Sequence, residues 1–340
     1  MDVTAVDGGS FDMEETRLTE DIIKGFVQLV NFKEPQGPVT SLSFSDDGEL
    51  CVTTSLDQTL NIYNCVTGEH STTLYSKKYG ANLARFVHEN SSVLYASTKE
   101  DDTIRYLSVH DNKYIRYFKG HTGQVTCLQM SPVDDTFISA SLDNTVKIWD
   151  LRRSSPAGSL KTDGRPTIAF DPEGLVFAVG MDSGVIKVYD ARKYESGPFA
   201  TWSIRDDYYY PNGLLPWNAL KFTNDGKHIL VSTTGNTNYI IDAFEGTMRQ
   251  RLTGHDVPQI ETYGENTGFS PDSQFVFAGG ANGSLTAWNL SNVINQDAAI
   301  PDNTPMGTMD TCQGSEIRAF GFNPHYMMMV VCGPSVAFYG

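Results

Sequence analysis

The chain of 340 residues is 40% hydrophobic and 11% aromatic, which supplies enough apolar side chains for a folded interior and excludes disorder throughout its length. Its 41 acidic and 25 basic residues give a formal net charge of −16. Because affinity for a phosphate backbone depends mainly on Lys and Arg, we expect no direct binding to nucleic acid. An acidic surface suits solubility and basic protein partners.

The cysteines indicate a reducing compartment, and the distribution of apolar residues indicates that no segment spans a membrane. The five cysteines are odd in number and no two stand in a Cys-x-x-Cys spacing, which argues against a disulfide framework and against a structural zinc site. No apolar run reaches the roughly 18 residues of a membrane-spanning helix. The N-terminus lacks the basic and apolar regions of a signal peptide. We therefore expect a protein of the cytosol or nucleus without a membrane segment.

Residues 1–23 carry far more acids than bases, which predicts an acidic, flexible N-terminal tail. The acids are Asp2, Asp7, Asp12, Glu14, Glu15, Glu20 and Asp21, against Arg17 as the base. Within this tail, Thr19-Glu20-Asp21-Ile22 resembles a helix capping box and indicates a short helical turn. Residues 24–340 are assigned to one folded domain.

A short strand-like segment recurs through this domain and places a large apolar residue at its fifth position. It reads TLNIYN at 59–64, TIRYLS at 103–108, TVKIWD at 145–150, VIKVYD at 185–190, TNYIID at 237–242, SLTAWN at 284–289 and SVAFYG at 335–340. The intervals lie close to the ~40–45 residue period of WD40 repeats and are longer in the later units.

A second recurring piece precedes these anchors: a short alternating strand that ends in Phe or Met and is followed by a turn. It reads VTSLSFSDDG at 39–48, VTCLQMSPVDD at 125–135, TIAFDPEG at 167–174, ALKFTNDG at 219–226, GFSPDS at 268–273 and IRAFGFNP at 317–324. Alternation is the signature of a strand, and Asp-Gly or Pro-Asp supplies a hairpin turn. In the third unit, residues 122–148 separate Gly120-His121 from Trp149-Asp150, which is the spacing of a four-stranded WD40 unit.

These seven units predict an all-β fold, a seven-bladed WD40 β-propeller over residues 24–340. The last anchor ends at Tyr339, one residue before the end of the given chain, so blade seven lacks an outer strand. Residues 26–30 (FVQLV) precede the first unit and belong to no blade of their own. We expect them to complete blade seven, because joining both ends of the chain in one sheet closes the ring and removes an open edge.

Four polar or aromatic residues of the third unit, His121, Ser139, Asp143 and Trp149, resemble a catalytic triad at first sight. Their spacing instead fits a buried network in which Asp143 orients His121, His121 bonds Ser139, and Ser139 bonds the indole N–H of Trp149. Buried polar groups must be paired, and a fully satisfied network fixes the blade. His255 is the expected degenerate counterpart in the sixth unit.

No motif of an enzyme is present. The sequence contains no phosphate-binding loop, no His-Glu-x-x-His zinc motif and no Gly-x-Ser-x-Gly nucleophile elbow. The acidic segments 46–48 and 171–174 lack the alternating ligands and terminal Glu of a calcium loop and are interpreted as turns. We therefore predict a non-catalytic protein with no metal and no cofactor.

Two loops are candidates for partner binding. SKKYG at 76–80 places Lys77, Lys78 and Tyr79 before the inner strand of blade two, although a solvated loop explains the lysines equally well. The segment DDYYYP before Trp217 contains Tyr208, Tyr209 and Tyr210, which cannot all enter one core. Exposed aromatic residues are favoured interface anchors, and Trp217 is included in this second candidate surface.

Longer segments resemble the WD-repeat protein 82 family and its fungal counterpart. They are SKKYG at 76–80, DDTIRYLSVHDNKYIRYF at 101–118, SPVDDTFISASLDNTVKIWDLR at 131–152, FDPEGLVFAVG at 170–180, GPFATW at 197–202, IDAFEG at 241–246 and PDSQFVF at 271–277. Together they cover six of the seven blades in matching order. The N-terminal tail and residues 292–314 do not resemble the family pattern.

The resemblance implies a nuclear, non-catalytic scaffold subunit, monomeric itself, with two sets of partners. One is the COMPASS complex that methylates lysine 4 of histone H3, in which such a subunit binds the N-terminal region of the catalytic methyltransferase. The other is the cleavage-and-polyadenylation machinery, in its phosphatase module that acts in transcription termination. Two complexes that share one subunit suggest segments that compete for one face. The residues do not indicate which face each partner uses or whether histone or ubiquitin is contacted directly.

An alternative function is that of a substrate receptor of a cullin ubiquitin ligase. Trp149-Asp150-Leu151-Arg152 matches the W-D-x-R pattern of such receptors, and Tyr189-Asp190-Ala191-Arg192 is similar to it. The pattern is short and common at the ends of blades. A propeller enzyme with a metal or quinone in its channel is disfavoured, because no ligand cluster is present.

Overall fold

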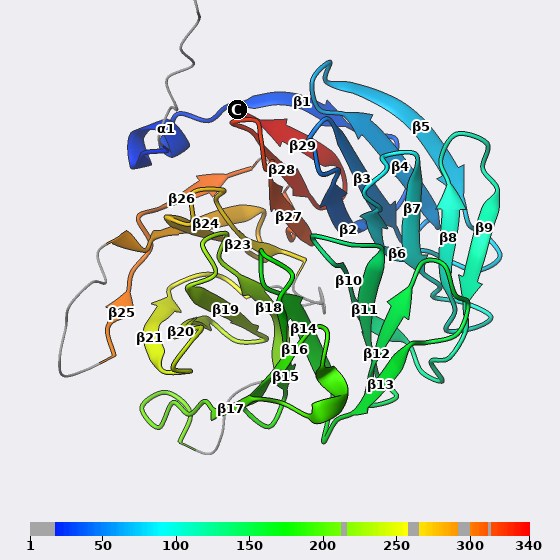
Figure 1. The fold of residues 1–340 in the computed structure, drawn as a ribbon. Coiled ribbons are helices and arrows are strands. Elements are labelled where there is room, and N and C mark those ends of the chain that lie inside the picture. The colour runs from blue at the N-terminus through cyan, green and yellow to red at the C-terminus, as the bar shows by residue number, and fades with distance from the viewer. Residues whose placement is uncertain (1–17, 212–215, 258–264, 292–299, 312–313) are drawn as a thin grey trace, which may run out of the picture.

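Seven β-sheets stand around a central channel in the structure, a computed structural model that describes residues 18–211, 216–257, 265–291, 300–311 and 314–340 (Figure 1). Six sheets have four strands and one has five. Each is antiparallel through its first four strands, which run in order from the inner to the outer side of the ring. The predicted seven-bladed propeller is therefore confirmed.

The first four blades follow the chain without interruption. Blade one consists of β2 (Val39–Phe44), β3 (Leu50–Ser55), β4 (Thr59–Asn64) and β5 (Glu69–Tyr75). Blade two consists of β6 (Asn82–Phe86), β7 (Ser92–Ala96), β8 (Ile104–Ser108) and β9 (Tyr114–Phe118). Blade three consists of β10 (Val125–Met130), β11 (Thr136–Ser141), β12 (Thr145–Asp150) and β13 (Gly158–Lys161). Blade four consists of β14 (Pro166–Phe170), β15 (Val176–Met181), β16 (Val185–Asp190) and β17 (Ala200–Ser203), with a 3-10 turn at Tyr194–Ser196.

In the last three blades the strands do not simply follow the order of the chain. Blade five consists of β18 (Trp217–Phe222), β19 (His228–Thr233), β20 (Thr237–Asp242) and β21 (Met248–Thr253), to which β25 (Asp302–Asn303) adds in parallel. Blade six consists of β22 (Thr267–Phe269), β23 (Phe275–Gly279), β24 (Ser284–Asn289) and β26 (Gly307–Asp310). Blade seven consists of β27 (Ala319–Phe322), β28 (Met329–Cys332), β29 (Val336–Tyr339) and β1 (Gln28–Phe32).

Each anchor found in the sequence is the third strand of its blade. This strand is hydrogen-bonded on both edges, and its fifth-position side chain is buried in every blade: Tyr63, Leu107, Trp149, Tyr189, Ile241, Trp288 and Tyr339. A large apolar residue recurs there because two neighbouring sheets close over it. The alternating segments ahead of the anchors are the inner strands that surround the channel.

The ring is closed by β1, which pairs with β29 at Val30 opposite Phe338 and at Phe32 opposite Val336. Two further backbone hydrogen bonds, of 3.1 and 3.2 Å, join Val27 and Gly340. The predicted closure is confirmed, although the strand begins at Gln28, two residues later than expected. Phe26 turns instead into the apolar cluster between blades six and seven.

A short helix, α1 (Glu20–Lys24), precedes this closing strand. Thr19 caps it by accepting a hydrogen bond of 3.3 Å from the backbone N–H of Ile22, so the predicted helical turn is present. Ile23 is buried against blades six and seven, so the described part of the predicted tail packs on the propeller. Residues 1–17 lie outside the described residues, and the division at residue 23 stays a prediction. No helix in the described part of the chain has the length and apolar character needed to cross a bilayer.

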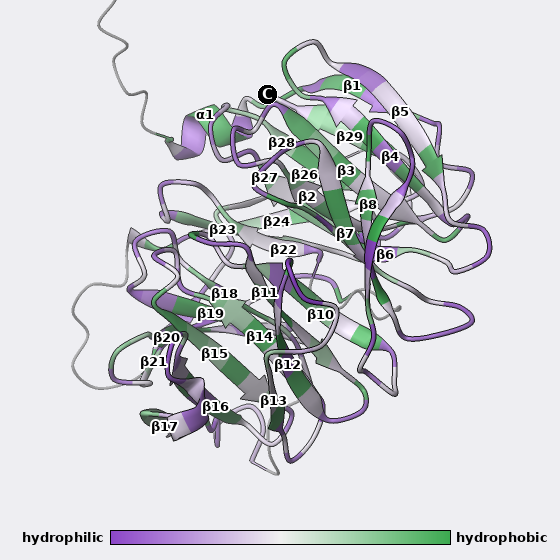
Figure 2. Cartoon of the chain, turned by 45° about the vertical axis from the view of Figure 1, so that its right-hand side comes forward, coloured by the Kyte–Doolittle hydropathy of each residue, from purple (hydrophilic) through white to green (hydrophobic). Residues whose placement is uncertain are grey.

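Apolar clusters fill the spaces between neighbouring blades. Blades four and five, for example, meet through Ile186 and Val188 on one side and Trp217, Leu220 and Ile229 on the other. Figure 2 shows hydrophobic residues concentrated along the strands and hydrophilic residues in the loops at both faces. Every sheet is therefore packed on both of its faces, which holds the loops on a stiff frame.

Blade three contains the polar network expected from the sequence. His121 Nδ1 lies 2.9 Å from Asp143 Oδ2, its Nε2 lies 2.7 Å from Ser139 Oγ, and Trp149 Nε1 donates to Ser139 Oγ at 2.8 Å. Burial lowers the pKa of His121 despite the neighbouring carboxylate, so the ring is neutral. Burial would raise the pKa of Asp143, but hydrogen bonds from Thr145, from the backbone N–H of Thr122 and from His121 hold that pKa at about 2.

His255 occupies the corresponding place in blade six without such partners. Its ring meets that of Trp288 edge-on at 5.4 Å, and Trp288 Nε1 donates to the Thr253 carbonyl at 3.1 Å rather than to a serine. Among the described residues, Nδ1 of His255 has no hydrogen-bond partner. Burial lowers the pKa of His255 to about 4. The imidazole is thus retained here as a packed, neutral ring.

Replacing Ser139 by Ala is expected to lower the free energy of unfolding by about 1–3 kcal/mol, because it leaves buried groups of both His121 and Trp149 without a partner. Chemical denaturation measures the change. Ser155→Ala, at an exposed position of the same blade, is the control and is expected to change stability by less than ~0.5 kcal/mol. Equal stability of the two variants would contradict the network.

The free energy of unfolding is expected to decrease as the pH is lowered, because His255 is buried and neutral in the folded protein. Below the ordinary histidine pKa of about 6.5, His255 binds a proton in the unfolded chain. In the folded protein it binds this proton only when the pH falls to its lowered pKa of about 4. The free energy of unfolding therefore decreases between these values, by at most ~1.4 kcal/mol per pH unit from this residue. His255→Asn should flatten the decline between pH values near 7 and 5, whereas His110→Asn, at an exposed position, should leave it unchanged.

Candidate partner-binding surface

Two faces of the propeller are defined by its connections. The loops from each outer strand to the next inner strand form the upper face, among them residues 76–81 and 204–211. The turns between first and second strands form the lower face, among them residues 45–49, 87–91 and 131–135. Both candidate loops of the sequence therefore lie on the upper face, one between blades one and two and the other between blades four and five.

The loop of residues 76–80 is tightly built. The backbone N–H of Gly80 donates to the Ser76 carbonyl at 2.7 Å, and Ser76 Oγ donates to the Gly80 carbonyl at 3.0 Å. Gly80 has φ of 69°, and a side chain there would overlap Thr98, so glycine is required. Ser76 Oγ is also hydrogen-bonded to Tyr95 OH at 2.9 Å. This frame leaves Lys77 and Lys78 exposed at the tip.

A buried arginine supports the same loop from below. Arg105 is 2% exposed, and its guanidinium carbon lies 3.6 Å from the ring centroid of Tyr79. The guanidinium donates to both carboxylate oxygens of Asp101, at 3.1 and 3.0 Å, and also faces the rings of Tyr114 and Tyr117. Tyr79 is half-buried by this stacking, so it positions the loop as well as lining its surface.

Aromatic rings and lysines alternate on this surface. Lys77 Nζ lies over the ring of Tyr75 at 5.4 Å, and Lys78 Nζ lies over that of Tyr79 at 5.1 Å. Tyr75 is 61% exposed and Tyr117 42% exposed. We call these five residues, Tyr75, Lys77, Lys78, Tyr79 and Tyr117, the lysine surface. A partner that covers it meets flat rings flanked by positive charge.

The second loop is anchored by a buried carboxylate. Asp206 accepts hydrogen bonds from the backbone N–H groups of Tyr208 and Tyr209 at 3.2 and 3.3 Å. Its two oxygens each accept a bond of 2.9 Å from Arg251, and one also accepts from Tyr239 OH at 3.1 Å. Burial would raise the pKa of Asp206, but these partners, Arg251 first, lower it, so the group stays ionised.

The three tyrosines of this loop have different surroundings. Tyr208 is 76% exposed, and Tyr209 is 41% exposed while donating from its OH to Asp302 at 2.7 Å. Tyr210 is half-buried against the core of blades four and five, and its OH donates to Asn236 at 3.2 Å. The guanidinium of Arg251 lies below the first two rings, at 5.6 and 5.7 Å. Tyr208 and Tyr209 are therefore the accessible pair.

Trp217 does not belong to this surface, and the inclusion of this residue as a partner contact is wrong. It is the first residue of β18, it has no exposed area, and its indole fills the space between blades four and five. A side chain at position 180 would meet that indole at 3.0 Å, and Gly180 leaves the room. The sequence places Trp217 after a long loop, which obscures its position at the start of an inner strand.

The triad-like set of blade three lies apart from both candidate surfaces. Ser139, the hydroxyl of the triad-like set, has no exposed area and cannot meet a substrate. The described residues contain no group of three or more His, Cys, Asp or Glu side chains that could hold a metal ion. The cysteines at positions 51, 65, 127 and 332 are free thiols, and residue 312 lies outside the described part.

Comparison with known proteins bears on these features. The family model described as "WD domain, G-beta repeat" matches residues 26–64, 112–150 and 246–289, and each match begins with the outer strand of one blade and runs into the next. The WD repeat-containing protein 82 of Drosophila melanogaster is 40% identical over 328 residues, which are 95% of this chain and 96% of that protein. The chain belongs to the WD repeat-containing protein 82 family.

Two fungal relatives are similar over most of their length. The Set1 complex component swd2 of Schizosaccharomyces pombe is 39% identical over 287 residues, covering 81% of this chain and 78% of the relative. The COMPASS component SWD2 of Saccharomyces cerevisiae is 36% identical over 307 residues, covering 89% of this chain and 91% of the relative. The resemblance of this chain to the WD repeat-containing protein 82 family is thereby confirmed across the propeller.

Two segments that carry the family resemblance, 197–202 and 241–246, meet between blades four and five. Gly246 has φ of 68° and faces the indole of Trp202, where any side chain would overlap the ring. Phe199 and Phe244, 64% and 76% exposed, flank this contact. The glycine is therefore required by the neighbouring blade as well as by its own turn.

The sequence does not reveal the residues that hold the candidate loops. Arg105 lies on β8 and Arg251 on β21, both far along the chain from Tyr79 and Tyr208, and only the folding of the blades brings each arginine to its tyrosine. Tyr75 is the last residue of the outer strand β5 and Tyr117 the one before the last of β9, where an aromatic residue is ordinarily interpreted as part of the sheet. For Arg105, an arginine inside the mostly apolar strand IRYLS is a signal that could have identified the support, whereas β21 (MRQRLT) gives no such signal for Arg251.

The W-D-x-R segment of blade three is also on the surface. Arg152 is 77% exposed at its side chain, and its guanidinium turns back to Asp150 with bonds of 2.9 and 2.7 Å. The backbone N–H of Arg152 also donates to Asp150. The arginine thus completes a local turn, which explains the motif without a partner.

Replacing Asp206 by Ala is expected to destabilise the protein by about 3 kcal/mol and to release the tyrosine loop, because Arg251 would lose two hydrogen bonds to a buried carboxylate and keep only a contact of 3.7 Å with the more exposed Asp302. Thermal denaturation and limited proteolysis at residues 204–211 measure these effects. Lys113→Ala, which breaks an exposed pair with Asp111, is the control and should leave the stability essentially unchanged. A small cost for Asp206→Ala would refute the anchoring role of the pair.

Proposed function

We propose that this chain is a non-catalytic scaffold subunit of the COMPASS histone H3 lysine-4 methyltransferase complex in the nucleus. The similarity to the Set1 complex and COMPASS components of the two yeasts, which extends over more than four fifths of this chain, carries the proposal. The loops of the upper face, held by Arg105 and Arg251, support a role in binding. Its role is to bind a segment of another subunit.

The partner is proposed to be the N-terminal region of the catalytic methyltransferase, which docks on the upper face. Two observations support this face. The loops that carry Lys77, Lys78 and Tyr79 of the lysine surface, and the accessible Tyr208 and Tyr209, are each held by a buried arginine paired with an aspartate. Because these loops are already ordered, binding costs conformational entropy mainly on the side of the partner.

A second set of partners is proposed from the family resemblance alone: subunits of the cleavage-and-polyadenylation factor, in its phosphatase module. Both sets are proposed to use the upper face, so that their segments compete for it. The chain itself is proposed to be a monomeric propeller within each assembly. The acidic composition agrees with protein partners rather than nucleic acid.

Charge reversal at the lysine surface tests the proposal. Lys77→Glu combined with Lys78→Glu, and separately Tyr208→Ala, are expected to reduce recovery of the methyltransferase and of polyadenylation subunits roughly tenfold or more in affinity purification from nuclear extract, because exposed aromatic and basic anchors dominate interfaces. Mass spectrometry identifies what is retained.

Matched substitutions on other parts of the surface are the controls. Lys193→Glu and Tyr326→Ala change an exposed lysine and a 38% exposed tyrosine away from the upper-face loops, and both should retain all partners. Loss of only one set of partners in the upper-face variants would contradict a shared face. Recovery of neither set, with a cullin adaptor in their place, would favour the alternative function as a ubiquitin-ligase receptor.

A further inference from the structure

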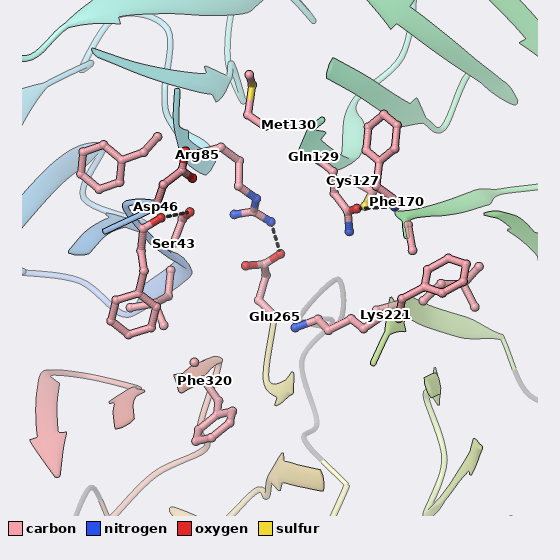
Figure 3. Close-up of a pocket in the computed structure, with 18 residues that line it drawn as sticks. Ser43, Asp46, Arg85, Cys127, Gln129, Met130, Phe170, Lys221, Glu265 and Phe320 are labelled. Atoms are coloured by element: carbon pink, nitrogen blue, oxygen red, sulfur yellow. Dashed lines mark hydrogen bonds and ion pairs between the residues drawn. The ribbon is translucent and has the colours of Figure 1, made fainter. Parts of the chain in front are cut away.

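The central channel contains a cavity of about 430 Å³ that the proposed function does not use. It is lined by the inner strands of the blades, and four of them present a polar or charged side chain at the position before their last residue: Ser43, Arg85, Gln129 and Lys221. These positions are equivalent in register, so the side chains converge on one level of the channel. Figure 3 shows Arg85, Lys221 and Glu265 pointing toward one another there.

Arg85 is fixed in this channel and its charge is balanced. Its Nη2 lies 2.6 Å from Glu265 Oε1, its Nε donates to the Leu128 carbonyl at 3.0 Å, and its Nη1 donates to the Ala84 carbonyl at 2.9 Å. The pair is only 15% and 10% exposed at its side chains. Glu265 is thereby committed to Arg85.

Lys221 has no carboxylate of its own among the described residues. Its Nζ donates to the Thr267 carbonyl, and the other two ammonium donors meet no acceptor in the described part of the chain. Burial lowers the pKa of Lys221, and the charge of Glu265 only partly opposes this. Because the charge of Glu265 is shared with Arg85, it does not fully balance the half-buried ammonium of Lys221, so the site favours a further negative group.

Gln129 adds another free donor at the same level. Its Oε1 accepts a bond of 3.0 Å from the backbone N–H of Phe170, which fixes the amide and leaves its Nε2 toward the channel (Figure 3). The described lining therefore offers more hydrogen-bond donors than acceptors. Such a surplus suits an acceptor-only group, which a carboxylate or a phosphate is.

The walls on the lower side of this level are apolar. The inner strands end there in Phe44, Phe86, Met130, Phe170 and Phe222, all of which line the cavity. Asp46 lies at the margin, but its carboxylate is paired with His88 at 2.7 Å. A ligand that enters from the lower face passes aromatic rings before it reaches Lys221.

We propose that the channel is a binding site for a carboxylate or phosphate group carried on an aromatic or apolar body, with Lys221, Arg85 and Gln129 as donors to the anion. The cavity has the size of a small-molecule site, and it combines apolar walls with a few convergent polar groups.

Calorimetric titration of the full chain with phenylacetate, phenyl phosphate, inorganic phosphate and the neutral phenylacetamide tests the site. We expect saturable binding of one or both aromatic anions at millimolar concentrations, weaker binding of inorganic phosphate, and none of phenylacetamide. The aromatic anion that binds more tightly identifies the preferred group. Absence of binding by both aromatic anions overturns the proposal, and inorganic phosphate equal to phenyl phosphate overturns the role of the apolar walls.

Variants of opposite expected sign separate binding from folding. Lys221→Met is expected to weaken the preferred anion roughly tenfold by removing a charged donor. Glu265→Gln frees Arg85 and is expected to strengthen binding roughly threefold or more. Lys227→Met, at an exposed lysine paired with Asp225, is the control and should bind like the unmodified protein. Unchanged affinity in Lys221→Met overturns the proposal, and so does weaker binding in Glu265→Gln. If Lys221→Met does not fold, the affinity of Glu265→Gln decides.

Discussion

Seven sheets packed side by side form a ring only when the first and last segments of the chain meet in one sheet, and here β1 supplies the outer strand beside β29. Without that pairing, blade seven would end in three strands, and the apolar cluster that Phe32, Tyr63 and Phe338 form between blades seven and one would open to water. The closed ring gives every sheet a neighbour on both faces. The positions of all upper and lower loops follow from this closure.

Buried arginines transmit this stiffness to the exposed surface in two places. Arg105 lies between Asp101 and the ring of Tyr79, and Arg251 lies between Asp206 and the rings of Tyr208 and Tyr209. In both, a carboxylate satisfies the charge and an aromatic ring covers the guanidinium. An exposed tyrosine held this way loses little freedom on binding, which is the condition for an efficient interface anchor.

The blades, their third strands and the closing strand could all be predicted from the sequence, because each depends on local alternation and on a large residue at a fixed position. Trp217 and the channel could not. Whether Trp217 is exposed depends on where the preceding loop ends, and that is decided by the fit of its indole beside Gly180 in another blade. The meeting of Arg85, Lys221 and Glu265 requires three blades to be placed around one axis, which local patterns do not encode.

The parallel strand β25 lies along the outer edge of blade five, where Arg251 N donates to the Pro301 carbonyl and Asn303 Nδ2 donates to Gln250 Oε1. In the described residues of the other blades, the outermost strand has no further strand beside it. Unpaired backbone groups at such an edge are templates on which another polypeptide can add a strand, in recognition or in aggregation. The chain thus occupies part of the outer edge of blade five with its own backbone, whereas the outer edges of the other blades, in the described residues, stay open to a polypeptide that docks in extended form.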